Sequence, residues 1–385
     1  MTTSRRLEPF GVTIFTEMTA LARDHGAINL GQGFPDWQGA SFAKEAASRS
    51  MERGESDQYP PSAGIPELRA ALASRYTGLL GRDIDPDTEV TVTCGCTEAL
   101  TACFLGLVNP GDEVVIIEPY YDSYPVGIAM AGAIPRHVTL RPPDFRLEPE
   151  QLRSVFNERT RAIVVNTPHN PTGRVLTSEE LQAVAALCIE HDSIAICDEV
   201  YEEITFGAEH LRLAAFPGMA DRTLTLSSVA KTFSLTGWKV GWTVASPVLT
   251  AGVRAAHQYM TFTTPTPVQH GTVAALSAPP TFYDDLRAKY LGLRDLLASG
   301  LAEVGFEVHL PQGTYFLLAG YDALSDDDDR SFARRLTTDF GVATVPPSVF
   351  YHDPIEGHGL LRFAFCKRSE VLVEALARLQ SLNAG

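Results

Sequence analysis

The sequence lacks an apolar run long enough to cross a membrane, since no stretch of about 18 apolar residues occurs in the 385 residues. Its first residues also lack the apolar core of a secretory signal. Basic residues are outnumbered by acidic ones, 31 to 47, which gives a formal net charge of -16. A chain this acidic repels nucleic acid and anionic membranes, and we therefore expect it to act on small molecules, without nucleic acid or membrane as partner. Because a secretory signal is not seen, we expect a cytoplasmic protein.

Cysteine is also scarce, and its pattern indicates neither disulfides nor a metal site. The six cysteines form no C-x-x-C pair and no Cys/His group with zinc spacing. Most lie in apolar runs, where free cysteine behaves as a small hydrophobe. We therefore expect reduced, structural cysteines and no bound metal. Lysine is scarcer still, with five lysines against 26 arginines.

Short apolar, β-branched runs alternate with helix-like stretches through much of the chain. This alternation predicts an α/β domain with a mostly parallel sheet between helices. The expected strands are Glu89–Cys94, Glu113–Glu118, Arg161–Asn166, Ser193–Asp198, Thr223–Ser227 and Val240–Ala245, and the expected helices include Thr97–Val108, Ser178–His191 and Pro247–Met260.

The pattern changes after the proline-rich segment Thr264–Pro267. A long helix, Phe282–Val304, comes first, and short strands follow near Phe306–Leu310 and Thr314–Leu318. This order predicts a second, smaller α+β domain, which suits a chain too long for one small core.

Lys231 is the candidate nucleophile. It follows an apolar strand in SSVAKTFSLTGWKVGW, residues 227–242, a segment that also holds Lys239. A desolvated lysine has a lowered pKa and can attack an aldehyde. The alternative is a solvated lysine at a strand end, and position alone favours it because most lysines are exposed.

Asp198 and Asn170 also follow apolar strands. Asp198 is expected at the carboxyl end of its strand, where α/β proteins bind ligands, with Tyr201 close behind. The alternative role for Asp198 is a helix N-cap. Asn170 lies in NTPHNPTG, residues 166–173, whose prolines and glycine favour a rigid turn that can hold its amide in place. The alternative is an ordinary turn without a role in binding.

Gly95, Cys96 and Thr97 lie between a predicted strand and a predicted helix. Backbone N–H groups at a helix N-terminus can hold a phosphate. Many strand–helix turns have this composition, so the segment alone is a weak indication.

Seven segments, in order, resemble the class I/II aminotransferases, which are fold-type-I pyridoxal phosphate enzymes. They are NLGQGFPD, QYPPSAGIPELR, GDEVVIIEPYYDSY, NTPHNPTG, CDEVYE, SVAKTFSLTGWKVGW and LRFAF, and they span residues 29–365. The sequence is most similar to the kynurenine/methionine/glutamine aminotransferase branch, which also has lysine at the position of Lys239. The resemblance implies a large cofactor-binding domain of residues 45–275, a small domain of residues 1–44 and 276–385, and a homodimer with shared active sites.

The resemblance also implies roles around pyridoxal 5'-phosphate. Lys231 would form the Schiff base and move the proton between substrate and cofactor, and Asp198 would pair with the pyridine nitrogen. Asn170 and Tyr201 would donate to the phenolic oxygen, and Tyr121 would stack on the ring. The phosphate group would be held by Gly95, Cys96, Thr97, Ser228, Lys239 and Tyr59 of the partner subunit.

Arg362 lies in the apolar segment LRFAF, residues 361–365. Burying an unpaired arginine is costly, so it serves either a structural ion pair or a carboxylate ligand that fits its planar fork. The resemblance implies the second role, in which Asn170 and the Gly33 backbone help Arg362 to bind the substrate α-carboxylate. The side-chain pocket would be formed by Phe15, Tyr59, Phe350 and Phe262 of the partner subunit.

Such aromatic walls favour a large neutral donor, for example methionine, an aromatic amino acid, kynurenine or glutamine. We therefore expect an aminotransferase that passes the amino group of an L-amino acid to a 2-oxo acid by a ping-pong mechanism. The alternatives are another fold-type-I reaction (a β-lyase, an oxidase or a biosynthetic aminotransferase for an unusual amino acid), a ligand-sensing regulator, and an inactive relative. The last two are disfavoured, because the match leaves no room for a DNA-binding module and all five principal site residues are present.

Overall fold

A computed structural model describes residues 3–54 and 56–384. Its centre is a seven-stranded sheet in the order β2-β8-β7-β6-β5-β3-β4. β8 runs antiparallel to both of its neighbours, and the remaining neighbours pair in parallel. The strands are β2 (Val90–Thr93), β3 (Glu113–Glu118), β4 (Ile134–Thr139), β5 (Thr160–Asn166), β6 (Ile194–Asp198), β7 (Thr223–Ser228) and β8 (Gly241–Val244). The expected α/β fold with a mostly parallel sheet is confirmed.

Helices cover both faces of this sheet, which is why its inner strands are apolar throughout. Val114 and Ile116 of β3 pack into one hydrophobic cluster, and Val115 and Ile117 pack into another on the opposite face. The first cluster includes side chains of α4 (Cys96–Leu107), α5 (Ser123–Ala131) and α9 (Pro247–Met260). The second includes side chains of α6 (Pro149–Val155) and α7 (Ser178–Glu190).

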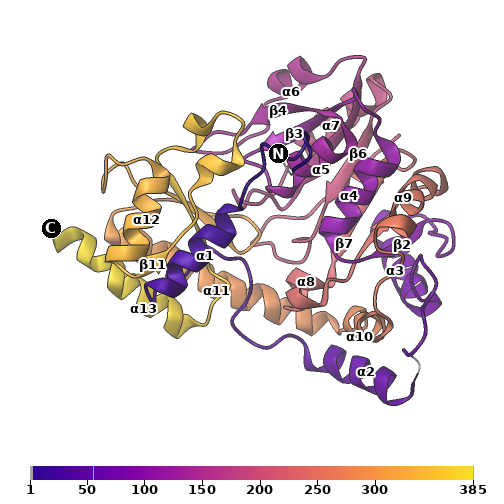
Figure 1. Ribbon diagram of the computed structural model, residues 1–385, viewed down its shortest axis with the longest axis horizontal. Helices are drawn as coiled ribbons and strands as arrows, with labels where there is room; N and C mark the ends of the chain where they lie inside the picture. Colours follow the sequence, from indigo (N-terminus) through magenta and orange to yellow (C-terminus); the bar gives the residue numbers. More distant parts are fainter. Residues whose placement is uncertain (1–2, 55, 385) are drawn as a thin grey trace.

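Two smaller sheets lie on the other side of the molecule, with the C-terminal helices (Figure 1). One has the order β12-β10-β9, and in the other β1 pairs with β11 in parallel. Their strands are β1 (Ile28–Asn29), β9 (Glu307–His309), β10 (Phe316–Gly320), β11 (Val342–Ala343) and β12 (Leu360–Ala364). Around them lie α1 (Ile14–Asp24), α11 (Pro280–Val304), α12 (Asp329–Asp339) and α13 (Ser369–Leu379).

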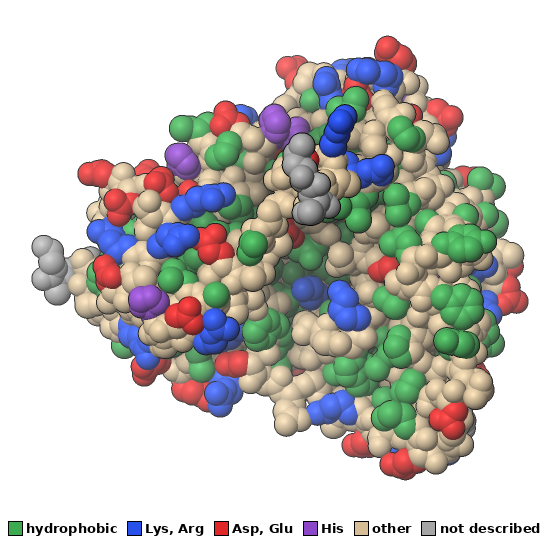
Figure 2. Space-filling view, in the orientation of Figure 1, with side chains coloured by type: hydrophobic (Ala, Val, Ile, Leu, Met, Phe, Trp, Pro, Cys, Tyr) green, Lys and Arg blue, Asp and Glu red, His purple; other side chains and the backbone are tan. Residues whose placement is uncertain are grey.

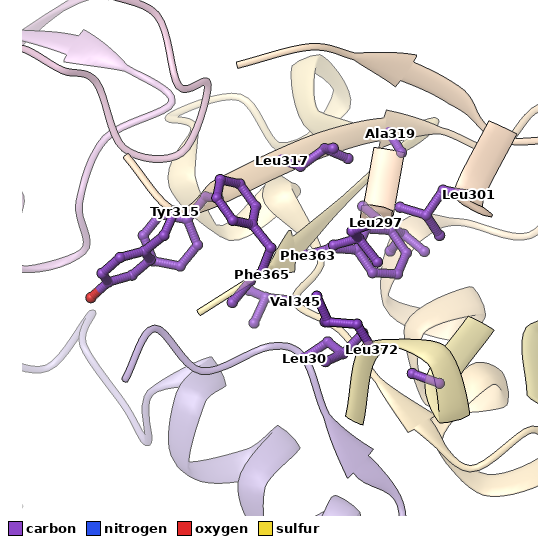
Figure 3. Packing of buried hydrophobic residues seen from close by; sticks show 14 of the residues in the cluster. Leu30, Leu297, Leu301, Tyr315, Leu317, Ala319, Val345, Phe363, Phe365 and Leu372 are labelled. Atoms are coloured by element: carbon purple, nitrogen blue, oxygen red, sulfur yellow. The ribbon is translucent and has the colours of Figure 1, made fainter. Parts of the chain in front are cut away.

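A third hydrophobic cluster fills this part of the molecule. Figure 3 shows Leu317 and Phe363, from β10 and β12, packed with Leu297 and Leu301 of α11. The β1–β11 pairing joins the N-terminal segment to the C-terminal part of the chain. We therefore still propose that residues 1–44 and 276–385 form one smaller domain and residues 45–275 the larger one.

The remaining helices are α2 (Ser41–Glu52), α3 (Pro66–Leu80), α8 (Val229–Thr232) and α10 (Thr266–Leu276). Within residues 3–54 and 56–384, no helix has both the length and the apolar character needed to cross a membrane.

The expected strands and helices agree with the structure to within about two residues at most ends. The sequence analysis missed β4, which contains Pro135 and has partly exposed side chains. It is the edge strand of the sheet, where proline is tolerated and no continuous apolar run is required. Strand β10 begins at Phe316 rather than Thr314, since Thr314 has a left-handed backbone with φ 66°.

Candidate active site

A cavity of about 320 Å³ opens where the parallel strands of the large sheet end. Asn166, Asp198 and Ser228 are the last residues of β5, β6 and β7, and all three line it. Arg362 of β12 closes the cavity from the smaller sheets. Figure 2 shows the molecule hollowed between these two parts, with basic side chains in the hollow. The carboxyl ends of parallel strands are where α/β sheets bind ligands.

Asp198 is a buried carboxylate held in a fixed orientation. Its Oδ2 accepts a hydrogen bond from the Tyr124 hydroxyl at 2.9 Å, and its Oδ1 accepts from the Val200 N–H at 3.4 Å and the Cys96 thiol at 3.6 Å. Burial raises the pKa of Asp198, and these three donors oppose that increase. A carboxylate in this environment is strongly stabilised by a cationic N–H partner.

Lys231 lies on α8, directly after β7, and its Nζ lies 5.5 Å from the Tyr201 ring centroid and 5.6 Å from that of Tyr315. Burial lowers the pKa of Lys231 against the opposing effects of Cys366 and Asp198, and the positive charge of Arg362 lowers it further. Burial and the charge of Arg362 raise the fraction of neutral amine, which is the nucleophilic and proton-accepting form.

The first turn of α4 forms a cradle next to a lysine. Gly95 precedes the helix with φ 83°, a conformation that favours glycine. A Cβ on Gly95 would lie 3.2 Å from Nζ of Lys239, so the glycine keeps this space open. Residues 95–97, Ser228 and Lys239 all line the cavity, and helix N–H groups, a hydroxyl and an ammonium are a donor set that suits a phosphate dianion.

Arg362 is buried, with 2% exposure, between the core residues Leu361 and Phe363. Its Nη1 donates to Oδ1 of Asn170 at 3.2 Å, and its Nη2 donates to the carbonyl oxygen of Gly31 at 2.7 Å. Its Nε has no hydrogen-bond partner among the described residues.

The Arg362 guanidinium lies 4.1 Å from the ring centroid of Phe316, with Phe15 and Phe350 also within 6 Å. Burial lowers its pKa to about 10. Its hydrogen-bond acceptors are neutral and Asp122 acts on it only from beyond ion-pair distance, so a carboxylate ligand would supply an ion pair that no described residue provides.

Asn170 is fixed by groups on both sides. Its backbone N–H donates to Oδ1 of Asn166 at 2.7 Å, and Nδ2 of Asn166 donates to the carbonyl oxygen of Asp198 at 2.8 Å. Because Arg362 donates to its side-chain oxygen, Asn170 faces a ligand through its NH₂ group. Tyr201, which is 3% exposed, also lines the cavity.

The cavity brings together thirteen of the sixteen predicted site residues. These are Phe15, Gly33, Gly95, Cys96, Thr97, Tyr121, Asn170, Asp198, Tyr201, Ser228, Lys231, Lys239 and Arg362. Phe350 lies behind the cavity wall, stacked on Phe15 at 5.9 Å. Tyr59 and Phe262 lie outside the cavity of their own chain, 84% and 47% exposed, with their rings 5.5 Å apart.

Four residues that shape the site were not predicted from the sequence: Tyr124, Asn166, Gln32 and Phe316. Tyr124 is the third tyrosine of EPYYDSY, and only the helical turn of α5 brings its hydroxyl to Asp198. Phe316 lies against Gly33, where an added Cβ would come within 2.4 Å of the ring. The strand-end position of Asn166 was a usable signal, whereas the role of Phe316 depends on a contact between distant segments.

The fold is that of the fold-type-I aminotransferases, as comparison with solved structures shows. An N-succinyldiaminopimelate aminotransferase from Mycobacterium tuberculosis is 46% identical with a TM-score of 0.95, covering 99% of this chain and 100% of that one. A structure from Escherichia coli, described as having a methionine aminotransferase function, is 41% identical with a TM-score of 0.94, again covering 99% and 100%. A kynurenine–oxoglutarate transaminase from Dictyostelium discoideum is 37% identical, over 99% of this chain and 96% of its own length.

The family model for aminotransferase class I and II matches residues 25–379, and the chain belongs to that family. Enzymes of this family depend on pyridoxal phosphate, so the chain is a pyridoxal-phosphate-dependent transaminase. The residues of the cavity fit this cofactor, because a phosphate cradle, a buried carboxylate and a desolvated amine lie around one space.

Proposed function

We propose that the enzyme transfers the amino group of a large neutral L-amino acid to a 2-oxo acid. The observation that carries this proposal is Arg362, a buried guanidinium at the cavity with an unpartnered Nε and only neutral hydrogen-bond acceptors. Both amino acids and 2-oxo acids carry the carboxylate that such a planar fork binds.

Different residues of the cavity suit different parts of the cofactor. The phosphate would be held by the N–H groups at Gly95, Cys96 and Thr97, with Ser228 and Lys239. Asp198 would pair with the pyridine nitrogen, Asn170 and Tyr201 would donate to the phenolic oxygen, and Tyr121 would stack on the ring. Bound there, the cofactor supplies an aldehyde for the amino group and a ring that accepts electrons from the substrate α-carbon.

Lys231 would take the proton from the substrate α-carbon and deliver it to the cofactor carbon that bears the aldehyde. Its lowered pKa keeps more of the amine neutral, as a general base requires. Arg362 lines the same cavity, so one group orients the carboxylate while the other acts on the neighbouring carbon. Donor and acceptor would use one carboxylate site in turn, as the proposed ping-pong mechanism requires.

The walls of the cavity favour a neutral donor side chain. The cations among its described lining residues are Lys231, Lys239 and Arg362, and each has a role in the scheme above. Phe15, Phe34 and Phe316 supply apolar surface, and a distal carboxylate against such rings would be desolvated without a partner. The second candidate donor is an N-acylated diamino acid, favoured by the 46% identity to the N-succinyldiaminopimelate enzyme.

A panel of amino donors with 2-oxoglutarate tests this function. We expect L-methionine, L-phenylalanine, L-kynurenine or L-glutamine to exceed L-aspartate in kcat/KM by about tenfold or more, roughly 1.4 kcal/mol in transition-state binding. Formation of L-glutamate distinguishes transamination from lyase or oxidase chemistry. A tenfold preference for aspartate would contradict the neutral pocket, and a preference for N-succinyldiaminopimelate would select the second candidate.

The Arg362→Lys variant should raise KM for the amino donor about 30-fold or more, with a smaller effect on kcat, because lysine cannot form the planar two-point contact. Steady-state kinetics measures both constants. Arg378→Lys is the matched control, since Arg378 forms a partly exposed pair with Glu374 on α13. An unchanged KM in Arg362→Lys would assign this arginine a structural role.

We also propose a homodimer in which Tyr59 and Phe262 reach the active site of the partner subunit. Their exposure and their position outside the cavity of their own chain support this arrangement. The cytoplasmic location stays a prediction.

A further inference from the structure

A buried group of charged side chains lies behind the turn that carries Asp198 and Tyr201. The sequence of this turn is Asp198-Glu-Val-Tyr-Glu202. Asp198 and Tyr201 line the cavity, whereas the carboxylates of Glu199 and Glu202 make their contacts elsewhere and are 1% and 4% exposed. The turn is therefore two-sided, with site residues on one side and buried anions on the other.

Glu202 connects this turn to the end of β7. One of its carboxylate oxygens accepts a hydrogen bond from the Ser227 hydroxyl at 3.0 Å, and the other accepts from Nη2 of Arg212 at 2.5 Å. Arg75 of α3 approaches the first oxygen at 3.9 Å. Ser227 directly precedes Ser228 at the phosphate end of the cavity.

Glu199 extends the same group. Its Oε2 lies 2.9 Å from Nε2 of His210 and 3.4 Å from Nε of Arg212. Its backbone N–H donates to the carbonyl oxygen of Leu226 on β7. The turn is thus fastened to β7 at two points, through the Glu199 backbone and the Glu202 side chain.

Glu202 is charged in this environment. Burial by itself raises the pKa of a carboxyl group, but the positive charges of Arg212 and Arg75 outweigh it and hold the pKa of Glu202 below its usual value. A buried carboxylate between two arginines is costly to neutralise, because the guanidiniums then lose their compensating charge.

We propose that Glu202 is a positioning residue for the transamination chemistry. By joining the turn to Ser227, it sets the placement of Asp198 and Tyr201 relative to Ser228 and Lys231. The inference rests on the proposed function, because these are the groups that act on the cofactor there. Arg362 lies on a different strand and does not depend on this connection.

The test compares Glu202→Gln with Glu203→Gln. Glutamine keeps the shape of Glu202 and removes its charge. The matched control, Glu203, has its ion pairs at the edge of the group, with Arg75 and Arg287. The measurements are kcat and KM for the amino donor, and the dissociation constant of pyridoxal phosphate from the apoenzyme, obtained by fluorescence titration.

We expect kcat of Glu202→Gln to fall about 10- to 100-fold, since a small misplacement of reacting groups has effects of this size. The cofactor dissociation constant should rise about tenfold, whereas KM should change less than about threefold. Glu203→Gln should stay within about twofold of wild type in all three. If the two variants are alike in kcat and cofactor affinity, the inference is wrong.

A second variant keeps the test decisive if Glu202→Gln does not fold. Ser227→Ala removes the hydroxyl that joins the turn to β7 and leaves all charges in place. It should lower kcat several-fold with little change in KM, and a wild-type kcat would overturn the inference. If the wild type transfers no amino group, the proposed function fails; if it does and Glu202→Gln keeps full kcat and cofactor affinity, only the positioning role fails.

Discussion

Replacing Lys231 with alanine is expected to lower kcat at least about 10⁴-fold, the largest effect of any single substitution in this chain. By our proposal, the variant loses the amine that attacks the aldehyde and the base that moves the α-proton. The cofactor should still bind, because the phosphate cradle, Asp198 and Tyr121 remain. Single-turnover kinetics with the amino donor measures the loss.

Lys289→Ala is the control for this substitution. Lys289 lies on α11 with its Nζ 3.3 Å from the Trp37 ring centroid, and it does not line the cavity. Its replacement should leave kcat within about twofold, as expected for a lysine that touches no reacting group. Turnover of Lys231→Ala comparable to wild type would remove Lys231 from the reaction.

Asp198→Asn should lower kcat at least about 100-fold, since the preorganised charge that stabilises a protonated pyridine nitrogen is lost. Cofactor affinity should change less, because the phosphate contacts are untouched. Asp198→Glu keeps the charge and should retain part of the activity. These constants follow from steady-state kinetics and from titration of the apoenzyme with pyridoxal phosphate.

Asp192→Asn is the matched control, because its exposed side chain precedes the same strand, β6, and pairs with Arg222 at the surface. It should behave as wild type. A near-normal rate for Asp198→Asn would show that the buried carboxylate has only a structural role.

The ends of the central strands could be predicted because apolar runs stop at polar residues. Asp198 and Asn166 are the last residues of β6 and β5, and the parallel sheet places them side by side. The sequence marks each strand end separately, and the topology then brings the ends into one cavity. This is why the predicted residues from this sheet lie together.

The residues around Arg362 in the sequence do not separate its two predicted roles, and only the resemblance to the aminotransferases favoured the binding of a carboxylate. A structural ion pair and a ligand-binding arginine both need an arginine in an apolar strand. The proposed carboxylate-binding role is supported by its hydrogen bonds to Asn170 and Gly31 and by its Nε, which has no partner among the described residues. These contacts join segments far apart in the chain, so the local sequence pattern does not predict them.

The charged group around Glu202 could not be predicted from the sequence for the same reason. The segment CDEVYE places Asp198 at a strand end, but nothing local predicts the contacts of Glu199 and Glu202. The contacts of Glu202 with Arg75 and Arg212 are seen only in the folded structure. Tyr59 and Phe262 are a different case, because a role in the partner subunit requires a second chain.

We propose that Lys231 binds the cofactor covalently, and with only five lysines in the sequence the labelled residue can be identified directly. The protein is loaded with pyridoxal phosphate, reduced with borohydride, digested and mapped by mass spectrometry. We predict one phosphopyridoxyl group per chain, on Lys231 among the five lysines, and its loss when the amino donor is added before reduction. A label on another lysine, or none on Lys231, would contradict the assignment of Lys231 as the residue that binds the cofactor.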